Sequence, residues 1–93
     1  MSVGDLFQLS GRQALVTGGG GGLGRGIVAA LAGAGATVAV LGRSAAADEA
    51  AASVDGIAIR ADLSDRAELR RGFDESVDAL GGLDVLVTCH GAL

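Results

Sequence analysis

The chain has 93 residues, 49% of them hydrophobic, with 17 glycines, no proline and two aromatic residues, Phe7 and Phe73. This length suits one small domain, and a core that must be filled by Val, Leu, Ile and Ala is typical of a buried parallel sheet. The formal net charge is −4 and the arginines are spread along the chain, so the sequence has no basic patch of the kind that binds a nucleic-acid backbone. Nucleic acid is therefore not expected as a partner.

Cys89 is the only cysteine, which excludes an intrachain disulfide and a cysteine-cluster zinc site. We expect no metal. No apolar run approaches the roughly 18 residues of a membrane span, and no cationic segment followed by a long apolar one begins the chain. A cytoplasmic protein without a membrane partner is therefore expected.

Short apolar blocks alternate with helical patterns along the rest of the chain. Strands are predicted at residues 13–17, 37–41, 56–60 and 84–88, and helices at residues 23–34, 45–53 and 65–80. The order β-α-β-α-β-α-β with continuous apolar strands predicts an α/β fold, the N-terminal part of a Rossmann-like doubly wound parallel sheet. In the dinucleotide-binding winding the strands lie in the order 3-2-1-4, which leaves the fourth strand at an open, apolar edge.

The first and the last predicted helix each carry a predicted core stripe. The stripe of the first helix is Leu23, Ile27 and Leu31, and that of the last helix is Leu69, Phe73, Val77 and Leu80. The last helix is expected to begin at an N-cap, Ser64 or Asp65, because both side chains accept hydrogen bonds from free backbone N–H groups.

A run of glycines, Thr17-Gly18-Gly19-Gly20-Gly21-Gly22-Leu23-Gly24, joins the first predicted strand to the first helix. Glycines allow a tight turn and a close approach to a pyrophosphate, and the helix N-terminus aims free N–H groups at the anion. The register Gly19-x-Gly21-x-x-Gly24 fits a dinucleotide fingerprint. The run nearly matches a nucleoside-triphosphate loop but lacks two residues that such a loop requires. Arg25 replaces the lysine that reaches the phosphates, and Gly26 replaces the hydroxyl residue that holds magnesium.

A third register, Thr17-Gly18-x-x-x-Gly22-x-Gly24, resembles the TGxxxGxG motif of the short-chain dehydrogenase/reductase family. The resemblance extends over essentially the whole chain. Residues 9–18 are similar to the family's opening, Ala61-Asp62-Leu63-Ser64 to its acidic corner after the third strand, and residues 83–87 to its fourth strand.

The resemblance implies a Rossmann domain over residues 1–93 that binds NADP(H) or NAD(H) within an oxidoreductase interconverting an alcohol and a carbonyl. The cofactor-binding residues that it implies are Thr17, Gly18, Gly22, Leu23 and Gly24 at the pyrophosphate turn, Arg43 and Ser44 after the second strand, Asp62 and Leu63 at the adenine, and Gly91. Gly91 is what remains of the family's Asn-Asn-Ala-Gly motif in Thr88-Cys89-His90-Gly91.

Cofactor choice depends on the end of the second strand, where an acid would bind the ribose 2′-OH and an arginine would pair with a 2′-phosphate. Arg43 stands there, so NADP is preferred, with Ser44 as a further donor and NAD as the alternative. In many NADP-preferring members of the family that this chain resembles, a basic residue stands at the position of Gly21, so one of the two usual contacts is absent here. Two plainer roles stay open: Arg43 as a solvated loop residue, and Asp62 as a cap of the turn into the last helix.

In the family that this chain resembles, a tyrosine donates to the carbonyl oxygen, and a lysine four residues later lowers its pKa. The chain has neither residue type. His90 has no visible partner for acid-base work, and a structural role is the alternative. The resemblance therefore implies a cofactor-binding portion, truncated before the catalytic segment and inactive alone, with no catalytic residue of its own.

The opening and the glycine run look most similar to gluconate-type dehydrogenases and 3-oxoacyl reductases. The expected partners of the complete protein are a small-molecule carbonyl or alcohol substrate and further copies of itself in a homo-oligomer. Two alternatives differ in class. One is a non-catalytic nucleotide-binding or scaffold module, a shortened homologue; the other is a methyl-transferring domain, which Arg43 disfavours because such a domain needs an acid there.

Overall fold

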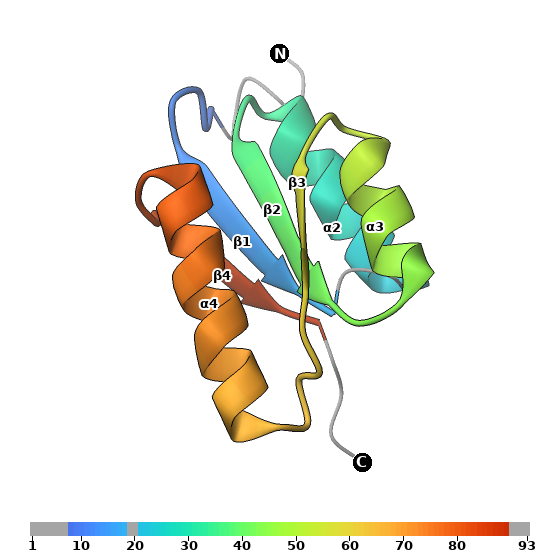
Figure 1. The fold of residues 1–93 in the computed structure, drawn as a ribbon. Helices are drawn as coiled ribbons and strands as arrows, with labels where there is room; N and C mark the ends of the chain where they lie inside the picture. Colours follow the sequence, from blue (N-terminus) through green and yellow to red (C-terminus); the bar gives the residue numbers. More distant parts are fainter. Residues whose placement is uncertain (1–7, 19–20, 90–93) are drawn as a thin grey trace.

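The computed structural model describes residues 8–18 and 21–89 (Figure 1). Strands and helices alternate along this part of the chain, as predicted. The elements are β1 (Gln13–Thr17), α2 (Gly22–Gly33), β2 (Thr37–Gly42), α3 (Ala45–Ala52), β3 (Ile57–Arg60), α4 (Arg66–Leu80) and β4 (Val85–Thr88). Every predicted strand and helix is present, with its ends displaced by no more than about one residue.

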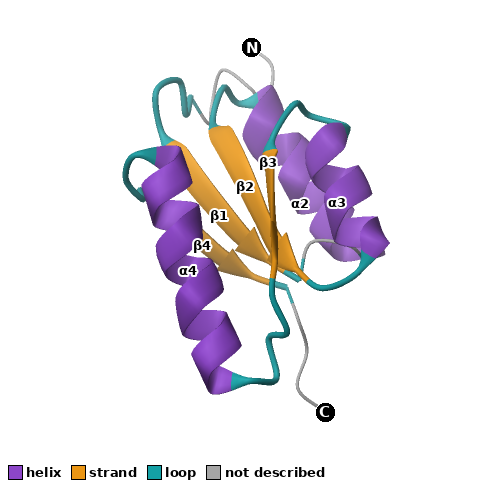
Figure 2. Cartoon of the chain, viewed as in Figure 1, coloured by secondary structure: helices purple, strands orange, loops and turns teal. Residues whose placement is uncertain are grey.

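The strands form one parallel sheet in the order β3-β2-β1-β4, which confirms the predicted order. Thr17 at the end of β1 pairs with Leu41 of β2 and with Thr88 of β4, and Gly42 pairs with Arg60 at the end of β3. The carboxyl ends of all four strands therefore meet at one edge of the sheet. Helices α2 and α3 cover one face and α4 covers the other (Figure 2).

The two central strands carry the core. On the face covered by α2 and α3, buried valines and alanines of β1 and β2 pack together: Ala14, Val16, Val38 and Val40, with Val28, Ala47 and Ala51 of the helices. On the opposite face, Leu15, Ala39 and Leu41 pack with Ala61 and Leu80. Apolar side chains on both faces of β1 and β2 explain why these two strands read as continuous hydrophobic runs.

The outer strands differ from the expectation of continuous burial. Burial alternates along both β3 and β4, with Ala58 and Arg60 exposed in the first and Leu86 and Thr88 in the second. Successive side chains of a strand point to opposite faces of the sheet, so in each outer strand one row packs against the core and the other row stays open to solvent. Leu86 is 51% exposed.

The helix stripes were predicted correctly only in part. Leu23 was expected in the core, but it is 76% exposed, and Gly24 and Val28 are the buried residues of α2. The helix begins at Gly22, so Leu23 lies in its first turn, where its side chain is exposed, while Gly24 of the same turn is buried. Ile27 and Leu31 pack against the core partly buried, as expected.

In α4, the residues closest to the sheet are small ones. Gly72 and Ser76 are buried there, and the Ser76 hydroxyl donates to the carbonyl oxygen of Gly72 at 2.7 Å. The predicted residues Leu69 and Phe73 flank this contact and are half-buried against the same core. The prediction of the stripe from hydrophobicity alone missed the small residues that let the helix approach the sheet closely.

Helices α3 and α4 begin at capped ends. Ser44 Oγ accepts from the backbone N–H of Ala47, and Asp65 accepts from the N–H groups of Ala67 and Glu68. Asp65 is thus the N-cap of α4, one of the two residues predicted for that role. Over the residues that the structure describes, none of the helices combines the length and the apolar character needed to cross a membrane.

Candidate functional site

The site is built at the carboxyl edge of the sheet, where β1, β2 and β3 end beside one another (Figure 2). Gly18 directly follows β1 and has a φ of +73°, a conformation that favours glycine. Its N–H donates to the carbonyl oxygen of Leu41 at 2.9 Å. This bond ties the start of the glycine turn, residues 18–22, to the end of β2, two residues before Arg43.

The N-terminus of α2 differs from those of α3 and α4. Its N-cap, Gly21, provides no side-chain hydrogen bond, and no acidic residue lies in the first turn. A β-carbon built on Gly21 or Gly22 would have no atom of the described residues within 4 Å, so there is open space around these two positions. Free N–H groups, the positive end of the helix dipole and open space together suit an anion such as a diphosphate.

Three further residues predicted for this turn have different surroundings. Gly24 is buried in α2, and exposed Leu23 precedes it at the open edge. Thr17 is only 4% exposed, and its hydroxyl has no hydrogen-bond partner among the described residues. Its side chain lines a groove of about 470 Å³ on the α4 side, together with Arg66, Leu69, Arg70, Phe73, Leu86 and Thr88. The Thr17 carbonyl accepts from Cys89 N–H at 2.8 Å, which joins the end of β1 to the chain after β4.

Arg43 and Asp62 come together across the site. Arg43 follows β2 and Asp62 follows β3, and Nη1 of the arginine lies 3.5 Å from Oδ2 of the aspartate. Their side chains are 74% and 39% exposed. Ser44, predicted to donate a hydrogen bond to the cofactor, is the N-cap of α3. Its Oγ accepts from the backbone N–H of Ala47 at 3.3 Å, and the same hydroxyl has a hydrogen that it can donate to a ligand.

The carboxylate of Asp62 also shapes the turn into α4. Its Oδ1 accepts from the backbone N–H of Ser64 at 3.0 Å and from the Ser64 hydroxyl at 2.6 Å. These bonds, and then the charge of Arg43, lower the pKa of Asp62 below its ordinary value. The structural role that the sequence left open for Asp62 is therefore present, and Oδ2 still faces Arg43. The neighbouring Leu63 packs half-buried against the core on the α4 side.

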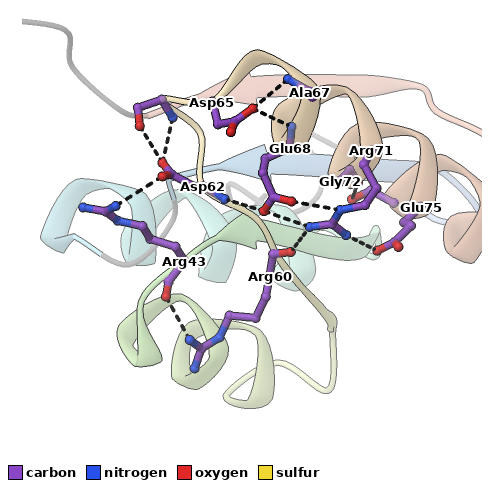
Figure 3. A network of polar contacts seen from close by, with 11 residues as sticks. Arg43, Arg60, Asp62, Asp65, Ala67, Glu68, Arg71, Gly72 and Glu75 are labelled. Atoms are coloured by element: carbon purple, nitrogen blue, oxygen red, sulfur yellow. Dashed lines mark hydrogen bonds and ion pairs between the residues drawn. The ribbon is translucent and has the colours of Figure 1, made fainter.

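A chain of charged residues that sequence reasoning missed supports this arrangement (Figure 3). Arg60 donates from Nη1 to the backbone carbonyl of Arg43 at 2.8 Å and is paired with Asp48 of α3. Arg71 of α4 donates to the carbonyl of Arg60 at 2.8 Å and bonds Glu68, which accepts from the N–H of Asp62 at 3.3 Å. The signal in the sequence was an arginine at the end of an apolar strand, but its partner depends on the register between β2 and β3.

Four residues considered in the sequence, Gly19, Gly20, His90 and Gly91, lie outside the described residues. Within residues 8–18 and 21–89, no group of three or more His, Cys, Asp or Glu side chains is placed to hold a metal ion.

With this geometry in place, the relationship to known proteins is clear. The family model described as short chain dehydrogenase matches residues 12–93. The chain belongs to the short-chain dehydrogenase family, and it forms a cofactor-binding portion of that family's oxidoreductases with a Rossmann-like sheet. A nicotinamide dinucleotide is accordingly the class of cofactor that goes with the site.

Individual relatives agree with this assignment. A cis-1,2-dihydrobenzene-1,2-diol dehydrogenase of Pseudomonas putida is 43% identical over 84 residues, which is 87% of this chain and 30% of the relative. The solved structure of a hydroxysteroid dehydrogenase from Escherichia coli matches with a TM-score of 0.85 and 33% identity, over 95% of this chain and 40% of that one. A short-chain type dehydrogenase/reductase from Mycobacterium marinum matches with a TM-score of 0.81 and 40% identity, over 100% of this chain and 40% of that one. The chain thus spans between 30% and 40% of the length of these relatives.

Proposed function

We propose that the chain binds NADP(H) in preference to NAD(H). The observation that supports this proposal is the position of Arg43 at the carboxyl edge. Arg43 lies two residues after Leu41, whose carbonyl holds Gly18 at the start of the glycine turn. A dinucleotide whose diphosphate lies at the N-terminus of α2 would place its adenosine ribose near the end of β2. An arginine in that place pairs with a 2′-phosphate, whereas an acid would bind a 2′-OH.

The residues that would hold the cofactor come from three segments: the N-terminus of α2, the end of β2 and the turn after β3. Backbone N–H groups at Gly22, Leu23 and Gly24 would bind the diphosphate, and exposed Leu23 offers an apolar contact at the same edge. Arg43 and the Ser44 hydroxyl would bind the 2′-phosphate. Asp62 and Leu63 would bracket the adenine, with Asp62 already held by Ser64. Of the three remaining predicted residues, Thr17 and Gly18 would shape the turn, and Gly91 lies outside the described residues.

When bound, the nicotinamide would supply hydride transfer between an alcohol and a carbonyl. The tyrosine and lysine that the family resemblance assigns to proton transfer are not among these 93 residues. We propose that the chain alone binds the nicotinamide cofactor but does not catalyse hydride transfer. We further propose that the complete protein is a cytoplasmic homo-oligomer that acts on a small-molecule alcohol or carbonyl compound. The diol and hydroxysteroid named for its relatives are consistent with such a substrate class. The finer likeness to gluconate-type dehydrogenases or 3-oxoacyl reductases stays a prediction.

The selectivity is tested by titrating the chain with NADPH and NADH by calorimetry. We expect Arg43→Ala to weaken NADPH binding by about tenfold, since it removes a charge-assisted contact, and to change NADH binding little. The matched control is Arg70→Ala on α4, whose arginine is paired with Asp74 and is 82% exposed. This control removes the same charge and should leave both affinities unchanged. Equal losses for both cofactors in Arg43→Ala would contradict the preference.

A further inference from the structure

The backbone around Arg43 is held on several sides, while its side chain extends into solvent. The Arg43 carbonyl accepts from Arg60, the preceding carbonyl of Gly42 accepts from Ala61 N–H at 3.2 Å, and the next residue, Ser44, caps α3. Arg60 is held in turn through its side chain by Asp48. Arg43 is therefore held through its backbone, while its side chain is 74% exposed.

That guanidinium already has a negatively charged partner. The Asp62 carboxylate is oriented because its Oδ1 accepts two hydrogen bonds from Ser64, and this leaves Oδ2 directed at Arg43 at a distance of 3.5 Å (Figure 3). The carboxylate needs no rearrangement to hold the arginine. A 2′-phosphate arriving at Arg43 would meet an arginine that is already paired and a like charge beside it.

We propose that Asp62 limits the preference of the chain for NADP(H), because its carboxylate competes with the 2′-phosphate of NADP(H) for the Arg43 guanidinium. This inference rests on the proposed function, since it concerns the residue that reads the 2′-phosphate. Asp62 acts here through Arg43, as a positioning residue. NADH, which has no 2′-phosphate, leaves the Arg43–Asp62 pair intact and does not take part in the competition.

Exposed ion pairs contribute modestly, so the expected effect is a change of a few fold. In Asp62→Asn the carboxylate charge is lost, while the amide oxygen can still accept from Ser64. We expect the ratio of the NADH to the NADPH dissociation constant to rise about two- to fivefold. The ratio is the informative quantity, because a loss of an adenine contact would affect both cofactors alike and cancel.

The matched control is Asp65→Asn. It removes the same charge three residues further along the chain. The Asp65 carboxylate accepts from the backbone N–H groups of Ala67 and Glu68, and asparagine can keep this N-cap of α4 because its amide oxygen also caps helices. The cofactor ratio should stay at its wild-type value in this control. Circular dichroism of each variant checks that the fold is kept.

A double-mutant cycle with Arg43→Ala separates competition from direct repulsion. If Asp62 acts through Arg43, the Asp62→Asn change should have a clearly smaller effect on the ratio when Arg43 is already absent. An unchanged or lowered ratio in Asp62→Asn, or an equal rise with and without Arg43, would overturn the inference while leaving the proposed function intact. No binding of either cofactor to the wild-type chain would overturn both.

Discussion

A β-carbon built on Gly72 would lie 2.6 Å from Cδ1 of Leu41 and 2.9 Å from Cβ of Ala61, so α4 meets the sheet at this glycine with no room for a side chain. Gly72→Ala should therefore lower the free energy of unfolding by about 1–2 kcal/mol, since the overpacking outweighs the better helix propensity of alanine. Thermal or urea unfolding measures the change.

Gly26 provides the control for this prediction. It lies within α2, and a β-carbon there would have no atom within 4 Å. Gly26→Ala should raise the free energy of unfolding by up to about 1 kcal/mol, because only the helix propensity changes. If both variants were stabilised equally, the close contact between α4 and the sheet would be contradicted.

The pair formed by Asp48 and Arg60 predicts a pH dependence. The hydrogen bond from Arg60 lowers the pKa of the Asp48 carboxyl in the folded chain. The carboxylate therefore stabilises the fold at pH values above its unfolded pKa of about 3.9. This stabilisation is lost as the pH falls through the lower pKa of the folded state. Arg60→Met should raise the pKa of Asp48 toward its ordinary value. NMR titration of the carboxyl carbon measures it.

Arg70→Met serves as the control for the titration, because it breaks the exposed pair with Asp74 within α4 and should leave Asp48 unaffected. A pKa of Asp48 that is at its ordinary value in the wild-type chain, or that does not rise in Arg60→Met, would show that the pair is not formed in solution.

The edge strand β4 predicts self-association. Leu86 is 51% exposed on a strand with a single neighbour among the described residues, and an apolar edge is a template for pairing. We expect the chain to associate in a concentration-dependent manner and to bind a hydrophobic dye, and Leu86→Arg should reduce both. Sedimentation velocity measures the association. Ala29→Arg, a charge added on the exposed side of α2, should change neither property.

Much of the fold could be predicted because local signals and global arrangement agree. The β-branched strands, the glycines after the helices and the capping aspartate each specify their own element, and Asp65 and Gly81 cap α4 as their residue types suggest. The sheet order followed from the glycine motif and the alternation of elements, since both indicate the same winding. Arg43 and Asp62 were named from the sequence and do come together.

What could not be predicted depends on distances between elements. Leu23 matches the apolar stripe of α2 in periodicity, yet its side chain is exposed in the first turn, and periodicity does not show which turns of a helix lie over the sheet. Gly72 appears as an interruption of α4 until its contact with Leu41 is known. The bond from Arg60 to the carbonyl of Arg43 requires the register between β2 and β3, which a single sequence does not specify.

The central claim is that the turn after β1 and the N-terminus of α2 bind the diphosphate of a nicotinamide dinucleotide. The most direct test is a titration of the isotopically labelled chain with NADPH, followed by amide chemical shifts in NMR spectra. The account predicts saturable shifts at Gly18, at Gly22 to Gly24 and at Arg43 and Asp62, with α4 beyond its first turn unaffected. Binding that leaves the glycine turn unperturbed, or shifts confined to the α4 groove, would contradict it.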